Sequence, residues 1–249
     1  MNLEDLEKID SHKMYQTYDK WPDIAKQGYE QEFSVPEFKS IDHIVFAGMG
    51  GSGTIGDIIS SILSKNDVHT SVVKGYSLPK TVDSNTLVVV TSVSGQTNET
   101  LTVLRDSLKL NANVITFSSG GKIEEVSLKN KIPFFKINYT HSPRASLLGF
   151  LYSTLNVLED LLPINKSDIL ESLNLLNGTQ MEINSSNWDS IAVEVNGFTT
   201  YQWRVISQNY EKDNLNKDII RVANGWDESN FSIDLVRPTL KSFNVLFNP

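Results

Sequence analysis

Residues 41–53 read Ile41-Asp42-His43-Ile44-Val45-Phe46-Ala47-Gly48-Met49-Gly50-Gly51-Ser52-Gly53. The first seven residues form a short apolar run with branched side chains, which predicts a buried β-strand. The glycines that follow allow the backbone to turn sharply. Beyond them, large aliphatic side chains recur with the period of one helix face, at Ile55, Ile58, Ile59, Ile62 and Leu63. The stretch therefore predicts a strand–turn–helix unit.

The same alternation continues downstream. Further strands are predicted over residues 69–74, 87–92, 114–117 and 134–137, and helices are predicted after the strands that end at 92 and 117. The run Leu87-Val88-Val89-Val90 is apolar at every position, as in a central parallel strand. Strands that alternate with helices indicate right-handed βαβ units. We therefore expect an α/β fold, an open parallel sheet with helices on both faces.

Four segments are expected along the chain. Residues 1–40 are polar, with scattered aromatic side chains, and predict one or two short helices packed outside the α/β domain of residues 41–165. A helix over about 167–176, stopped by a turn at Asn177-Gly178, and a linker make up residues 166–187. Residues 188–249 open with a predicted strand at 191–195, but no clear period follows. They are read as a partial or divergent second unit.

Composition excludes several classes of protein. The 249 residues include no cysteine, which excludes disulfides, zinc ribbons, iron–sulfur clusters and thiol catalysis. A net charge of −8 argues against a general nucleic-acid surface and against polybasic attachment to a membrane. No apolar run is long enough to span a membrane, and the start of the chain does not resemble a signal peptide. We expect a cytoplasmic protein.

The glycine-rich turn is the first candidate site. Its spacing, Gly48-x-Gly50-x-x-Gly53, matches the dinucleotide fingerprint, and a helix N-terminus behind glycines suits an anion. A lone match of this kind is weak, and a tight turn without a ligand is the alternative. The dinucleotide interpretation also lacks an acidic residue at the end of the second strand, where Lys74 would instead have to contact the 2′-phosphate of NADP.

A second turn, Ser92-x-Ser94-Gly95-x-Thr97, follows the third predicted strand and precedes a helix. Three hydroxyls and the N–H groups of a helix start make a set of donors that fits a phosphate without a cationic side chain. A capped turn is the alternative, because serine, glycine and threonine favour turns anyway. Both turns lie at carboxyl ends of parallel strands, so together they predict one phosphorylated ligand.

A third candidate is Pro143-Arg144-Ala145-Ser146, at the predicted start of a long helix that opens at Ser142 and ends before Pro163. One interpretation is that Arg144 contacts a sugar phosphate or a developing oxyanion. The alternative interpretation is that Arg144 is an ordinary surface arginine. His141 is either an acid–base group or an ordinary loop histidine.

These three motifs, in this order, resemble the sugar isomerase (SIS) domain superfamily, and more closely the bifunctional phosphoglucose/phosphomannose isomerases of archaea and some bacteria. The resemblance implies the SIS fold, a flavodoxin-like three-layer arrangement, with two SIS subdomains in tandem and a homodimer. It implies interconversion of glucose 6-phosphate or mannose 6-phosphate with fructose 6-phosphate, without metal or organic cofactor. The site residues it implies are Ser92, Ser94 and Thr97 for the phosphate, Gly50, Gly51 and Ser52 for the sugar, and Arg144 for the enediolate.

The second half of the chain departs from the family pattern. In the family the base is a glutamate in a Gln-x-Asn-Glu pattern, and a later histidine helps to open the sugar ring. This chain has Gln208-Asn209-Tyr210-Glu211, which is similar but shifted, and no histidine follows His141. Glu211 is therefore either the base or a solvated charge. A module that binds a phosphosugar without turning it over remains an alternative function.

Overall fold

The computed structural model describes residues 10–185. At its centre lies a five-stranded parallel sheet with the strand order β2-β1-β3-β4-β5. The strands are β1 (His43–Ala47), β2 (His69–Val73), β3 (Thr86–Ser92), β4 (Asn113–Ser118) and β5 (Phe134–Lys136). This arrangement confirms the predicted open parallel sheet.

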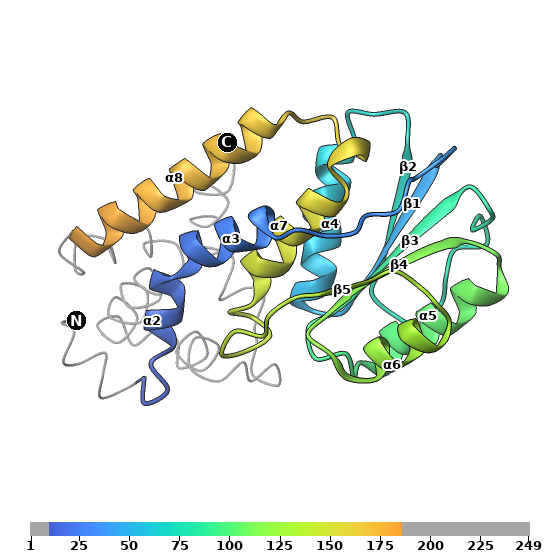
Figure 1. Ribbon diagram of the computed structural model, residues 1–249, viewed down its shortest axis with the longest axis horizontal. Helices are drawn as coiled ribbons and strands as arrows, with labels where there is room; N and C mark the ends of the chain where they lie inside the picture. The colour runs from blue at the N-terminus through green and yellow to red at the C-terminus, as the bar shows by residue number, and fades with distance from the viewer. Residues whose placement is uncertain (1–9, 186–249) are drawn as a thin grey trace, which may run out of the picture. The chain divides into compact units, whose positions relative to one another are not determined.

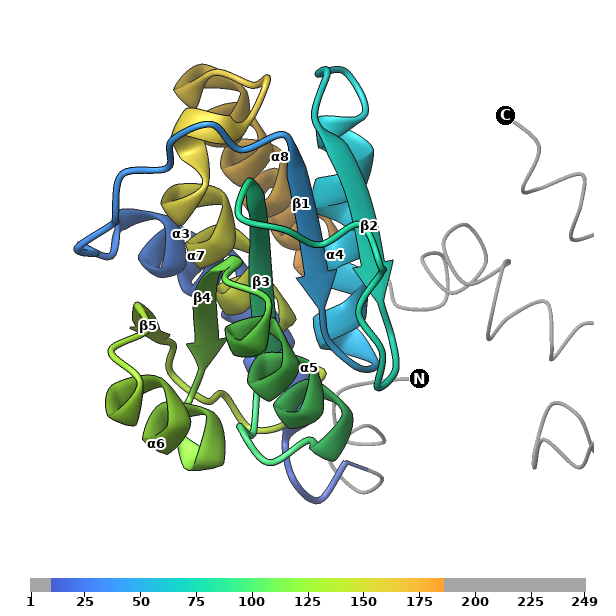
Figure 2. The ribbon, with the colours of Figure 1, turned by 90° about the vertical axis from the view of Figure 1, so that its right-hand side faces the viewer.

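Helices cover both faces of this sheet, as the sequence predicts (Figures 1 and 2). On one face lie α5 (Asn98–Lys109) and α6 (Gly121–Lys129). On the other lie α4 (Gly51–Leu63) and α7 (Leu147–Val157), with α3 (Trp21–Glu30) packed against α7. The remaining described helices are α2 (Met14–Asp19), the 3-10 turn η1 (Glu159–Leu161) and α8 (Lys166–Ser185).

Alternate residues of the central strands supply two separate cores. Ile44 and Phe46 of β1 pack with the helices α4 and α7, whereas Val45 and Ala47 pack with α5 and α6. Every residue of β1 and β3 is buried. Two faces buried at once explain why these strands read as continuous apolar runs rather than as alternating ones.

The path of the chain creates one crevice at the sheet's carboxyl edge. β1 and β3 are neighbours, but α4 leaves β1 toward one face and α5 leaves β3 toward the other. Ligands of open α/β sheets bind where neighbouring strands send their connections to opposite faces. The connection from β2 to β3, residues 74–85, contains no helix and crosses on the α5 side, where Leu78 and Val82 join the core.

Three helix boundaries differ from the predictions. The predicted end of the long helix just before Pro163 is wrong, because α7 ends at Val157 and the 3-10 turn η1 follows it. The predicted helix start at Ser142 is wrong: residues 143–146 form a turn in which the Ala145 N–H donates to Ser142 Oγ at 3.2 Å, and α7 begins at Leu147. The predicted stop at Asn177-Gly178 is also wrong, because α8 runs through it to Ser185. One glycine costs a helix only about 1 kcal/mol, so a helix of 20 residues tolerates it.

The described part of the N-terminal segment contains the short helices α2 and α3, and no helix follows them over residues 31–40. Gly28 of α3 approaches α7 so closely that a Cβ at this position would lie 2.7 Å from the carbonyl oxygen of Gly149. Ser153 of α7 donates a hydrogen bond to the Gly28 carbonyl at 3.1 Å. Residues 188–249, with the predicted strand at 191–195, lie outside the described residues. Within residues 10–185, no helix has the length and apolar character to cross a membrane.

A histidine pair lies at the amino edge of the sheet, away from the crevice. His43 of β1 is 5% exposed, and its ring centroid lies 4.6 Å from that of His69 on β2. Its Nε2 lies 3.1 Å from Ser71 Oγ. Burial, and then repulsion from His69, lower the pKa of His43, against the opposing effects of the Thr81 backbone and the carboxylates of Asp42 and Asp83.

This pair predicts loss of stability in mild acid. Because the folded pKa of His43 lies below the usual value of about 6.5, the unfolded chain binds this proton more tightly, and stability falls as the pH drops below that value. Replacing His43→Gln should therefore flatten the fall of the unfolding free energy between about pH 7.5 and about pH 5.5, measured by urea titration. An unchanged slope in His43→Gln would mean that His43 does not cause the loss of stability in mild acid.

Candidate functional site

The β1–α4 turn forms one wall of the crevice. Gly48 donates its N–H to the Val73 carbonyl at 3.1 Å, which ties the turn to β2. Gly50 has a φ of 54°, in the left-handed region that favours glycine. A Cβ on Gly53 would lie 2.8 Å from the Gly48 carbonyl oxygen. No side chain caps α4, and the Ser52 N–H donates to the Met49 carbonyl at 3.1 Å. The N–H groups of Gly51 and Gly53, in the same first turn, can face an anion.

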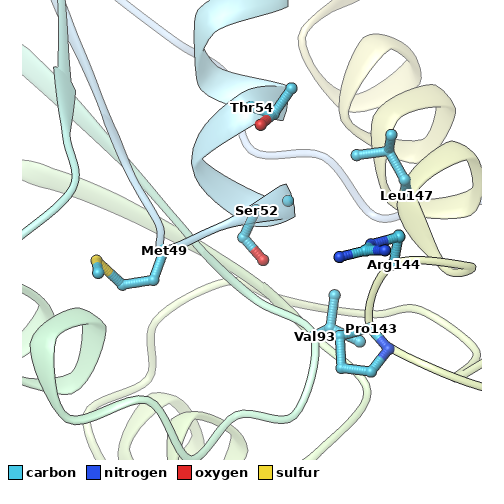
Figure 3. A pocket seen from close by; sticks show the side chains of 8 residues that line it. Met49, Ser52, Thr54, Val93, Pro143, Arg144 and Leu147 are labelled. Atoms are coloured by element: carbon cyan, nitrogen blue, oxygen red, sulfur yellow. The ribbon is translucent and has the colours of Figure 1, made fainter. Parts of the chain in front are cut away.

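A pocket of about 450 Å³ opens beside this turn (Figure 3). Three separate segments line it, through Met49, Gly51, Ser52, Thr54, Val93, Pro143, Arg144 and Leu147. In Figure 3 the Ser52 hydroxyl and the Arg144 guanidinium extend toward each other across the space between α4 and residues 143–147. The structure thus brings together three predicted site residues, Gly51, Ser52 and Arg144.

Arg144 supplies permanent positive charge to this pocket. Its side chain is exposed, and the ion pairs among the described residues all join lysines to carboxylates and do not include it. A guanidinium carries five N–H donors and is not deprotonated in proteins. An unpaired arginine in a pocket is suited to hold an anionic oxygen.

The β3–α5 turn carries the predicted hydroxyls. Ser92 is 2% exposed, and its Oγ accepts the Gly95 N–H at 3.2 Å and lies 3.0 Å from Thr97 Oγ1. Ser94 is exposed, and its Oγ accepts the Gln96 N–H at 3.3 Å, which leaves its own O–H to donate outward. Ser92 therefore organises the turn from within, whereas Ser94 faces solvent.

These hydroxyls do not line the pocket themselves. Val93, which lies between Ser92 and Ser94, contributes the β3–α5 turn's share of the lining. The pocket therefore ends against the hydroxyl turn. A ligand that fills the pocket with one end and contacts Ser94 with the other would span both.

A neighbouring turn braces the hydroxyl turn. Gly95 has a φ of 66°, and a Cβ there would lie 1.8 Å from the Gly120 carbonyl oxygen of the β4–α6 turn. The Ile123 N–H donates to the Gly95 carbonyl at 3.1 Å, and Ser119 Oγ donates to the Val93 carbonyl at 2.6 Å. Glycine at position 95 is therefore required by both its conformation and the close approach of two loops.

Two other residues singled out in the sequence lie outside the pocket. Lys74 Nζ is 2.5 Å from the Asp57 carboxylate of α4, so the cation on which the NADP alternative depends already has a partner. His141 is exposed and its Nε2 lies 3.0 Å from the carbonyl oxygen of His12. Neither residue lines the pocket.

The described lining of the pocket offers groups that can bind an anion, Ser52 and Arg144. Among the described residues that line it there is no carboxylate and no histidine. No group of three or more metal-binding side chains occurs within residues 10–185. Glu211, the predicted base, lies outside the described residues.

Sequence reasoning missed part of the site. It did not assign Met49, Thr54 or Leu147 to the pocket, although Met49 and Thr54 lie within or beside the glycine motif. Outside the pocket lining, it did not anticipate the contact of Tyr76, whose pKa is raised by its hydrogen bond to Glu99 in the first turn of α5. That contact joins the β2–β3 connection to α5 and has no local sequence signal.

Comparison with known protein families identifies the domain. Residues 37–127 match the family model of the SIS domain. This part of the chain is similar to SIS domains. The match includes the glycine turn and the hydroxyl turn of the crevice, and it confirms the SIS fold expected from the sequence motifs.

Several curated relatives of this chain carry the same name. The chain is 34% identical over 169 residues to a bifunctional phosphoglucose/phosphomannose isomerase from Aquifex aeolicus, an alignment that covers 66% of this chain and 50% of the relative. A relative of the same name from Thermoplasma volcanium is 30% identical over 210 residues, covering 81% and 64% respectively. The chain spans about half the length of the curated relatives it matches.

Solved structures support the fold. Tagatose-6-phosphate ketose/aldose isomerase from Escherichia coli superposes with a TM-score of 0.51 at 14% sequence identity, over 68% of this chain and 53% of that one. At this identity the likeness concerns the arrangement of strands and helices only.

The contact between Gly95 and Gly120 predicts a sensitive position. Gly95→Ala should lower the unfolding free energy by about 1–3 kcal/mol or more, because the added Cβ meets a backbone oxygen that cannot rotate away. Gly75→Ala is the matched control, since a Cβ there meets nothing within 4 Å. Equal stability of the two variants in urea titrations would mean that the two loops do not lie against each other.

Proposed function

We propose that the SIS domain serves the isomerisation of a hexose 6-phosphate, glucose 6-phosphate or mannose 6-phosphate, to fructose 6-phosphate. One observation supports this most strongly. An uncapped glycine turn, a hydroxyl turn and an unpaired arginine meet around one pocket at the carboxyl edge of the sheet. The names of the curated relatives point to the same chemistry.

The phosphate is assigned to the hydroxyl turn. Ser94 and Thr97 donate to phosphate oxygens, together with free N–H groups at the start of α5, which no side chain caps. Ser92 holds this turn in shape through Thr97 and the Gly95 N–H. A phosphate bound in this way needs no lysine.

The sugar carbons occupy the pocket beside Gly50, Gly51 and Ser52. A base removes the proton from C2 of the open-chain aldose, and the electron pair forms the C1–C2 double bond while the C1 oxygen becomes negative. Arg144 stabilises this enediolate oxygen. The proton on the C2 oxygen is then transferred to the C1 oxygen, and the base returns the abstracted proton to C1, which completes the ketose with a carbonyl at C2. No metal or organic cofactor takes part in the proposed reaction.

The base is assigned to Glu211. The described lining contains no group that can accept a proton from carbon at neutral pH, so the proposal takes the base from residues outside this lining. A homodimer in the cytoplasm is part of the proposal. A module that binds the phosphosugar without turnover is the second candidate, and this same lack of an acid in the described lining favours it.

A coupled assay separates the two candidates. Purified protein is given glucose 6-phosphate or mannose 6-phosphate, and the formation of fructose 6-phosphate is followed. Turnover that disappears in Glu211→Gln supports the isomerase. Thermal stabilisation by millimolar hexose 6-phosphate without turnover supports the binding module, because a ligand bound only to the folded state must stabilise it. If the protein shows neither turnover nor thermal stabilisation, both candidate functions are refuted.

Loss of the Ser94 hydroxyl tests the phosphate assignment. Ser94→Ala should weaken the binding of inorganic phosphate and of fructose 6-phosphate alike, by about 1–3 kcal/mol, because both ligands lose the same donor to a charged acceptor. Calorimetric titration gives the two dissociation constants. Ser64→Ala, at the opposite end of α4, should bind both ligands as the wild type does. A loss confined to the sugar phosphate would contradict the assignment.

Loss of the Arg144 charge tests the enediolate assignment. Arg144→Ala should reduce kcat more than it raises KM, because the oxygen carries full negative charge only near the transition state. Arg105→Ala, an exposed arginine on α5, should leave both constants unchanged. An equal loss of ground-state binding would mean that Arg144 serves as a substrate anchor instead.

A further inference from the structure

Arg144 does not stand on a regular helix. α7 begins at Leu147, and residues 143–146 form a turn. Ser146, 1% exposed, closes this turn by accepting the Thr140 N–H at 2.9 Å and lying 2.9 Å from the Ser142 carbonyl oxygen. Within the turn, the Ser146 N–H donates to the Ser142 carbonyl at 3.0 Å and the Leu147 N–H donates to the Arg144 carbonyl at 3.3 Å. Contacts from outside the turn add to these local bonds.

The N-terminal segment supplies such contacts on both sides of Arg144. The Trp21 indole Nε1–H donates to the carbonyl of Ala145, the next residue, at 2.8 Å. On the other side, His141 Nε2 lies 3.0 Å from the carbonyl oxygen of His12. Ala145 is fully buried, so its carbonyl depends on a protein partner.

Trp21 is itself held firmly. It is the first residue of α3, and its ring meets that of Tyr18 edge to face, with centroids 4.6 Å apart. Farther along α3, Gly28 lies against Gly149 of α7, the helix that follows the Arg144 turn. Helix α3 thus bridges α7 and the turn just before it, and the indole N–H is anchored to the same scaffold as the pocket.

We infer that Trp21 is a positioning residue that aims the Arg144 guanidinium into the pocket through its hydrogen bond to Ala145. This rests on the proposed function, which places Arg144 beside the enediolate. Trp21 touches no substrate. Its effect passes through the backbone of the adjacent residue, so it is selective for whatever Arg144 contacts and leaves the hydroxyl turn unaffected.

The experiment measures binding, so it does not depend on turnover. The probes are inorganic phosphate and arabinonic acid 5-phosphate, whose carboxylate carries the negative charge of the enediolate. Trp21→Phe keeps an aromatic ring beside Tyr18 but removes the N–H donor. Gln31→Leu is the matched control, because it removes another N–H tether of the N-terminal segment, to the Lys136 carbonyl at 3.2 Å, away from the pocket lining.

In Trp21→Phe the affinity for arabinonic acid 5-phosphate should fall about threefold to tenfold, the cost of one hydrogen bond, while inorganic phosphate binds unchanged. Gln31→Leu should bind both probes as the wild type does. In an Arg144→Ala background, Trp21→Phe should have no further effect, because the residue through which it acts is gone. His141→Ala, which removes the second tether, should show the same selectivity if Trp21→Phe fails to fold.

Several results would overturn the inference. If Trp21→Phe binds both probes like the wild type, or loses affinity equally with and without Arg144, Trp21 does not position the guanidinium, and the proposed function stands. If the wild type binds neither probe, the proposed function fails and the role of Trp21 fails with it.

Discussion

The parallel pairing of β1 with β3 is the constraint on which the site depends. Every residue of these two strands is buried, so helices must cover both faces of the sheet. α4 covers one face and α5 the other, and the crevice opens between them. Because parallel strands end at the same edge, the glycine turn and the hydroxyl turn meet there although 44 residues separate the Gly48 and Ser92 positions.

Close backbone packing at this edge shapes the binding groups. Gly53 lies against Gly48, and Gly95 lies against Gly120. Side chains are excluded at these contacts, so backbone N–H groups and short hydroxyls remain at the surface of the crevice. Such donors are well suited to a phosphate, since they need no flexible cation to be ordered on binding. The one unpaired cation of the described pocket lining, Arg144, is then left for the reacting end of the ligand.

In the proposed reaction, substrate binding and proton transfer are assigned to different parts of the chain. Groups within residues 10–185 hold the anion in this proposal. The proposal assigns the proton transfer to Glu211 on the basis of the family resemblance. The N-terminal helices, which the sequence marks only as an outer layer, join the site indirectly, because Trp21 and His12 hold the turn that carries Arg144.

Local patterns determined much of this protein from sequence alone. The apolar runs at 41–47 and 87–92 and the helical period after Gly53 were sufficient to predict the parallel sheet and the turns that hold the candidate residues. The SIS fold was expected from the resemblance that the three motifs carry. These features depend on side-chain periodicity and turn chemistry, which are properties of neighbouring residues.

Only the tertiary structure decided which of those residues share a pocket and how they are held there. Ser142 has the sequence features of a helix cap, but a turn that accepts a hydrogen bond from Trp21 follows it, and α7 begins only at Leu147. Gly178 looks like a helix stop, yet α8 continues past it. Ser92 is buried, whereas Ser94 is exposed. Trp21 donates a hydrogen bond to the carbonyl of Ala145, which lies 124 positions farther along the chain. Such contacts depend on the packing of distant segments, and no local pattern in the chain encodes them.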